Sequence, residues 1–101
     1  MNRQNTFAPS WGRGVELATS TSSGSVEVGA GSFTVCITNK DGTDGVFVRT
    51  GDSTVTALDP SDYFIPPNGQ VTLTKVKEHT HVAAIAEANT PTIHVIPGYG
   101  V

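Results

Sequence analysis

The sequence predicts an all-β fold: a single antiparallel β-sandwich, jelly-roll-like, with an extended N-terminal arm. Three observations lead to this prediction. Val, Ile and Thr account for 31 of the 101 residues against only three Leu, and β-branched side chains pack well on pleated sheets but lose freedom in helices. Eleven Gly and six Pro separate short apolar runs. No window of 11 or more residues has the apolar spacing of an amphipathic helix, so we expect little or no helix.

The apolar runs have strand-like lengths from residue 14 onward. We predict strands at 15–19, 25–28, 33–38, 46–50, 54–57, 63–65, 70–76, 80–87 and 92–96. Turn signals separate them, such as NKDGTDG at 39–45, DPSD at 59–62 and PPNG at 66–69. Short strands with a turn every 8–12 residues are typical of a sandwich or jelly roll.

Alternation within the strands indicates which side chains face inward. Phe33, Val35 and Ile37 alternate with smaller or polar residues, so they predict one apolar face, and we expect Phe33 and Phe47 in the core. The stretch HVAAIAE from residue 81 is apolar on both faces for five residues. This pattern predicts a central strand covered on each side, or a strand buried against a partner molecule.

Residues 1–13 are predicted to form the arm, and residues 14–101 the β-sandwich domain. The arm is polar and lacks a period of two, yet it carries Phe7 and Trp11. Large aromatic side chains in a polar segment indicate an anchor. The anchor can lie on the chain's own domain or on a neighbouring subunit, and the sequence favours neither.

Charge and composition exclude several partners. The net charge of −3 and the scattered Lys and Arg residues argue against a nucleic-acid partner, which requires clustered positive charge. No apolar run reaches membrane-spanning length and the first residues lack the pattern of a secretory signal, so we expect no membrane partner and synthesis in the host cytoplasm. The single cysteine, Cys36, excludes an internal disulfide.

The three histidines raise the question of a metal site. His79 and His81 form a His-x-His pair, whose side chains would share a face if both belonged to one strand, and His94 lies on the next apolar run. The metal motif of the cupins, G(x)5HxH(x)3–4E(x)6G, does not fit. Nine residues separate Gly69 from His79 where the motif has five, five residues separate His81 from Glu87 where it has three or four, and no glycine follows at the required distance. We therefore predict structural histidines and no bound metal.

No catalytic constellation is present in the sequence. It has no GxSxG, CxxC or HExxH motif and no phosphate-binding glycine loop, and its carboxylates fall mostly in turns. We predict that the protein is not an enzyme and that it has no catalytic residues and no cofactor.

The segments FTVCITNKDGTDGVFVRTGDSTVTA, DYFIPPNGQVTLTK and HTHVAAIAEANTPTIHVIPGYG, between residues 33 and 100, resemble small virion proteins of tailed bacteriophages. The resemblance is to the head decoration, or cement, protein family. It implies a virion protein that binds the outer capsid surface, with the major capsid protein of an HK97-like shell and other copies of itself as partners, as a homotrimer or homodimer. It also implies that residues 80–87 and 92–96 are adjacent strands joined by the turn at 88–91.

The candidate interface under this interpretation comprises the arm aromatics, the two-faced strand and the C-terminal tail. Its residues are Phe7, Trp11, His81, Val82, Ile85 and Tyr99. The alternative functions are a receptor- or carbohydrate-binding module of a phage fibre or tail, and a head–tail completion component. A sugar-binding platform usually exposes several aromatics, and this chain has only seven in all.

Overall fold

The computed structural model describes residues 7–29 and 31–100, and every regular element in this part of the chain is a β-strand. The strands are β1 (Ala8–Pro9), β2 (Val15–Ala18), β3 (Gly24–Glu27), β4 (Thr34–Asn39), β5 (Val46–Gly51), β6 (Tyr63–Ile65), β7 (Gln70–Thr74), β8 (His81–Ala86) and β9 (Thr92–Tyr99). The prediction of an all-β fold is confirmed. Within the described ranges, no helix exists that could cross a membrane.

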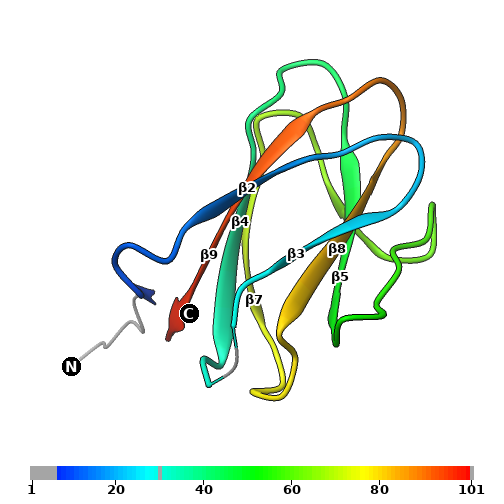
Figure 1. Cartoon of the computed structure of the whole chain (residues 1–101). Coiled ribbons are helices and arrows are strands. Elements are labelled where there is room, and N and C mark those ends of the chain that lie inside the picture. The colour runs from blue at the N-terminus through cyan, green and yellow to red at the C-terminus, as the bar shows by residue number, and fades with distance from the viewer. Residues whose placement is uncertain (1–6, 30, 101) are drawn as a thin grey trace.

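Two antiparallel sheets face each other (Figure 1). In the larger sheet the order is β2–β9–β4–β7, and β1 pairs with β9 beyond the end of β2. In the smaller sheet the order is β3–β8–β5–β6. From β2 to β9 every connection changes sheet except that between β5 and β6. The predicted two-sheet, antiparallel arrangement is therefore confirmed.

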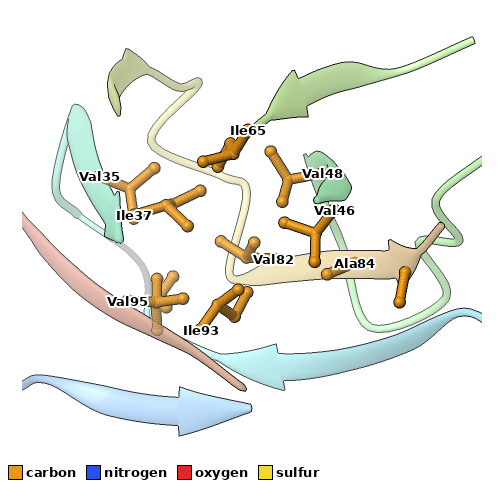
Figure 2. Close-up of a cluster of buried hydrophobic side chains, with 11 residues drawn as sticks. Val35, Ile37, Val46, Val48, Ile65, Val82, Ala84, Ile93 and Val95 are labelled. Atoms are coloured by element: carbon orange, nitrogen blue, oxygen red, sulfur yellow. The ribbon is translucent and has the colours of Figure 1, made fainter. Parts of the chain in front are cut away.

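The core lies between the sheets, where aliphatic side chains from both point toward one another (Figure 2). Val35 and Ile37 of β4 are fully buried, as their alternation predicts. From the opposite sheet, Val46 and Val82 meet them in the same cluster. Each such side chain stabilises the fold by about 1.5–3 kcal/mol through removal of apolar area from water. Alternation is thus the sequence signal that places the core.

Residues 54–57 form a loop, so the predicted strand there is wrong. The carboxylate of Asp52 accepts hydrogen bonds from the backbone N–H and the hydroxyl of Thr54, at 2.8 and 2.6 Å. The N–H of Val55 donates to the Asp52 carbonyl at 3.1 Å. A local turn built by an aspartate therefore overrides the β-branched composition of this segment.

The strands β8 and β9 are not neighbours, contrary to the expectation for residues 80–96. β8 lies between β3 and β5, whereas β9 lies between β2 and β4 in the opposite sheet. The connection at 87–91 therefore crosses between sheets. The central position of β8 explains why HVAAIA is apolar on both faces, because its neighbours in the sheet also shelter the side that faces away from the core.

The last strand continues to Tyr99, beyond the predicted end at residue 96, although it contains Pro97. The N–H of Lys40 donates to the carbonyl of Thr92 at 3.0 Å, and this bond identifies the even-numbered residues of β9 as those that hydrogen-bond to β4. Pro97 is odd-numbered, so its missing N–H removes no bond to β4. Its carbonyl instead accepts a hydrogen bond from the N–H of Ser10 at 2.9 Å.

The predicted arm is tied to the sheet over its described part. Ala8 pairs with Tyr99 and Pro9 with Gly98. The ring of Phe7 is half-buried against Gly98, where an added Cβ would lie 2.7 Å from the ring. Residues 7–10 therefore do not extend away from the sandwich, and residues 1–6 of the predicted arm lie outside the described residues.

Candidate functional site

Three large aromatic side chains are exposed on segments that flank the larger sheet: Trp11 two residues after β1, Phe33 directly before β4 and Tyr99 at the end of β9. Trp11 is 85% exposed, Phe33 50% and Tyr99 48%. We call these three residues the aromatic end. Two of the predicted interface residues, Trp11 and Tyr99, thus lie on the surface, and Phe33 joins them.

The sheet register positions the aromatic end. Thr34 of β4 is opposite Gly98 of β9, so Phe33 and Tyr99 lie opposite each other one position further along. Their ring centroids are 5.8 Å apart in an edge-to-face arrangement. The Tyr99 hydroxyl donates to the carbonyl of Gly31 at 3.2 Å, which fixes the ring.

Phe33 is not a core residue, so that expectation is wrong. Its position in the alternation points it inward, but it precedes the first residue of β4 and lies beyond the end of the packed core. Alternation predicts the direction in which a side chain points. It does not predict where the opposite sheet ends, and so it does not predict whether an inward-pointing side chain is covered. The sequence signal that could identify its exposure is its place directly after the glycine turn at Gly31.

A second apolar area lies on the outer face of the smaller sheet. Val82, Ala84 and Ala86 of β8 point into the core, so His81 and Ile85 point outward, and both are half-buried. Ile85 pairs with Phe47, and Phe47 pairs with Phe64 of β6 at a ring-centroid distance of 5.0 Å. The Phe64 ring is partly exposed.

Val82 does not belong to the interface, and its prediction as an interface residue is corrected here. Its side chain is 0% exposed and sits in the core cluster (Figure 2). A strand that is apolar on both faces supplies interface residues from only one of them. The outward members, His81 and Ile85, are the ones available at the surface.

A cavity of about 360 Å³ opens at the side of the sandwich where β2 begins and β3 ends. Its lining residues are Gly12, Arg13, Gly14, Val15, Glu27, Val28 and Gly29. Gly29 has a φ of 83°, and a side chain there would collide with the guanidinium group of Arg13. The charged lining residues, Arg13 and Glu27, have opposite signs, and Val15 and Val28 are apolar. The lining contains no nucleophilic side chain.

The three histidines have different surroundings. His79 precedes β8, with its Nδ1 2.8 Å from the Thr50 hydroxyl, whereas the Nδ1 of His81 is 2.7 Å from the Thr80 hydroxyl. His94 is on β9 in the other sheet. In residues 7–29 and 31–100, no three side chains of His, Cys, Asp or Glu converge in a way that could hold a metal ion.

The carboxylates mostly organise turns. Asp41 accepts hydrogen bonds from the backbone N–H groups of Asp44 and Thr43, at 2.7 and 2.9 Å, and these bonds hold the pKa of its carboxyl below the usual range. The hydroxyl and backbone N–H of Thr54 lower the pKa of Asp52 in the same way. Glu16 forms an exposed ion pair with Lys40, which lowers its pKa. These carboxylates are therefore stabilised in the charged form. A charged carboxylate accepts hydrogen bonds in a turn or an ion pair but has no proton to donate.

No protein-family model matches the sequence, and no curated protein matches it. Among solved structures the chain is similar to a subunit of Bacillus endospore appendages, described as a family of disulfide-linked pili. The TM-score is 0.56 at 12% identity, covering 98% of this chain and 94% of that one. A second similar structure is the Anabaena sensory rhodopsin transducer, with a TM-score of 0.37 at 17% identity, covering 77% of this chain and 96% of that one. The first likeness is one of fold alone.

Proposed function

We propose that this protein is a virion structural protein that decorates the outer surface of a phage capsid, binding the major capsid protein and stabilising the head. The observation that carries the proposal is the aromatic end. Three large exposed aromatic rings, two of them in edge-to-face contact, favour burial in a partner, because exposed aromatic area is unfavourable in water and aromatic anchors dominate protein interfaces. Self-association as a small symmetric oligomer, a homotrimer or homodimer, is part of the proposal.

The strand order supports a jelly roll as the finer description of the fold. Eight strands form two sheets of order β2–β9–β4–β7 and β3–β8–β5–β6, with connections that cross repeatedly between them. Double-sheet jelly rolls of eight strands are common in viral capsid and lectin domains. A fold hosts many functions, so the proposal rests on the exposed aromatic residues and takes only support from the topology.

A non-catalytic role is part of the proposal. Four titratable side chains contribute to local structure: Asp41 and Asp52 build turns, and His79 and His81 contact neighbouring hydroxyls. The cavity beside β2 and β3 is lined by one arginine and one glutamate without a nucleophile. Binding is the activity that these features support.

The test is the occupancy of the protein on phage heads. Trp11→Ala/Tyr99→Ala removes two of the three exposed rings and should lower occupancy at least tenfold, as loss of aromatic anchors at an interface costs about 2 kcal/mol or more. Tyr63→Ala is the matched control, because Tyr63 is 53% exposed and lies on β6, away from the aromatic end. Equal occupancy of the double variant and the control would overturn the proposal.

A filament subunit is the second candidate function, favoured by the fold likeness to the pilus subunit. This candidate requires head-to-tail contacts that do not close, so that copies add without limit. Electron microscopy of the purified chain distinguishes the two candidates. Fibres formed in the absence of any capsid would support the filament, and discrete small oligomers that bind only to heads would support the decoration protein.

A further inference from the structure

The strand β7 forms one edge of the larger sheet and pairs only with β4. Its five residues, Gln70–Thr74, contain no charge, no proline and no glycine. Free edges normally carry such features, because an unprotected edge pairs with other strands. Four further strands end a sheet: β1 has only two residues and contains Pro9, β2 contains Glu16, β3 contains Gly24 and Glu27, and β6 has only three residues. Among the described strands, β7 is thus the least protected edge.

The hydrogen-bond ladder identifies the backbone groups that face outward. The N–H of Lys75 donates to the carbonyl of Phe33, and the N–H of Asn39 donates to that of Gly69, both at 2.8 Å. Hydrogen-bonded pairs alternate along an antiparallel ladder, so the odd-numbered residues of β7 bond to β4. The N–H and C=O groups of Gln70, Thr72 and Thr74 therefore point to the free edge.

These outward groups are self-complementary about Thr72. If a second β7 runs antiparallel with Thr72 opposite Thr72, then Gln70 lies opposite Thr74 on both sides. All three outward-facing residues then fall in hydrogen-bonded pairs, giving about six N–H···O bonds across the interface. Opposed threonines make favourable cross-strand pairs, and no like charges face each other.

Half-buried apolar side chains add to the pairing. Val71 and Leu73 pack at the margin of the core and stay partly exposed along this edge. In the same register, Val71 of one copy lies opposite Leu73 of the other in a non-hydrogen-bonded pair, where side chains approach most closely. Water satisfies the free backbone groups of the monomer, so burial of this apolar strip supplies the net gain.

We propose that two copies of the chain associate through β7, antiparallel and centred on Thr72, to form a two-fold dimer with a continuous sheet across both larger sheets. This inference rests on the self-association that is part of the proposed function. Of the homotrimer and the homodimer it selects the homodimer, and it identifies β7 as the interface. It is independent of what the aromatic end binds.

The first test is a proline on the free edge. Thr72→Pro removes an N–H that faces outward, so the ladder to β4 keeps its bonds while the dimer loses its central pair. Sedimentation equilibrium should give the wild type twice the 10.5 kDa mass of a single chain, and the variant at least tenfold weaker association. Val71→Pro, whose N–H bonds to β4, is the folding control and should melt at lower temperature than Thr72→Pro.

The second test traps the register by a disulfide in a Cys36→Ser background. Opposed residues of a hydrogen-bonded pair have Cα atoms about 5.5 Å apart, within the range that a disulfide spans. Thr72→Cys should therefore oxidise to a covalent dimer. Ser25→Cys is the matched control: it is exposed on β3, and its backbone faces that sheet's free edge, because the N–H of Val28 bonds to Thr80.

The outcomes separate this inference from the wider proposal. A wild type that stays monomeric would overturn self-association and the β7 interface together. A dimer that Thr72→Pro leaves unchanged, or that cross-links through Ser25→Cys and not through Thr72→Cys, would overturn the β7 interface alone. A dimer that forms as described but does not bind heads would leave the interface standing and reject the capsid proposal.

Discussion

At the scale of single residues, Lys75 is the least expected feature of the molecule. Its side chain is only 4% exposed, and its ammonium group donates to the carbonyls of Ser32 and His79, at 2.9 and 2.8 Å. Burial lowers the pKa of Lys75, an effect that Glu78 partly opposes. Its two carbonyl partners come from loops whose conformation no periodicity encodes, so no local pattern identifies this site.

Lys75→Met should lower the free energy of unfolding at pH 7 by about 1–3 kcal/mol, because two buried carbonyls lose their donor. A lowered lysine pKa means that the unfolded chain binds more protons between the folded pKa and the ordinary value of about 10.4. The lysine's contribution to wild-type stability therefore rises with pH across that window, whereas the variant lacks this rise. Urea unfolding at pH 7 and pH 10 measures both effects. Lys77→Met, an exposed control, should change stability by less than about 0.5 kcal/mol.

Asp41 gives a prediction of the same sign at acid pH, because its pKa is also lowered in the folded chain. Its lowered pKa means that its contribution to stability is fully present above the unfolded value of about 3.9 and is lost as pH falls through the folded pKa. Asp41→Ala should lower the melting temperature at pH 7, and Asp41→Asn should lower it less, because the amide oxygen still accepts a hydrogen bond. The melting curves of wild type and Asp41→Asn should converge as the pH falls below the folded pKa of Asp41. A difference that persists there would contradict the assignment.

At the scale of elements, the attachment of β1 depends on Gly98. An added Cβ at this position would collide with the backbone carbonyl of Ala8 and lie 2.7 Å from the ring of Phe7. Gly98→Ala should therefore detach β1 from β9 while the rest of the sandwich stays folded. Limited proteolysis should then cut near residues 7–13 faster than in the wild type. Gly42→Ala is the control, because its added Cβ meets only Asn68, at an ordinary 3.5 Å.

Strand positions were largely predictable, because alternation and turn residues are local signals. The exceptions have identifiable causes. Asp52 builds a turn where Val55 suggests a strand, and β9 continues through Pro97 because its nitrogen faces away from β4. The tolerance of Pro97 depends on whether the odd- or the even-numbered residues of β9 hydrogen-bond to β4. Because β4 and β9 are distant in sequence, no local pattern predicts this.

At the scale of the whole molecule, the order of strands was beyond local reasoning. The resemblance to decoration proteins implies that residues 80–87 and 92–96 are adjacent strands, and neighbouring strands in sequence do commonly pair. Here the chain changes sheet at almost every connection, so β8 and β9 share the core but no hydrogen bonds. The candidate site was predictable where it rests on exposed aromatics in polar segments, as for Trp11 and Tyr99. Phe33 and the β7 edge emerge only from the assembled sheets.

The proposed dimer and the aromatic end together predict how the proposed binding to phage heads depends on valency. A two-fold dimer presents two aromatic ends, so the second contact with a shell is intramolecular and raises the overall affinity by a factor of about 10² or more if the spacing fits. Thr72→Pro leaves each aromatic end intact, and it should bind heads with an affinity lower by that factor. Trp11→Ala/Tyr99→Ala should stay dimeric yet lose binding.

Titration of undecorated heads with each variant, followed by sedimentation of the heads, measures these affinities. The variants then distinguish the roles of the two surfaces. Thr72→Pro loses the dimer but keeps the aromatic end, whereas Trp11→Ala/Tyr99→Ala keeps the dimer but loses the aromatic end. Heads saturated with wild-type protein should also withstand higher temperature before they release DNA, since many bivalent contacts must break at once. Equal affinity of Thr72→Pro and wild type for heads would contradict bivalent binding, even if the free protein is a dimer.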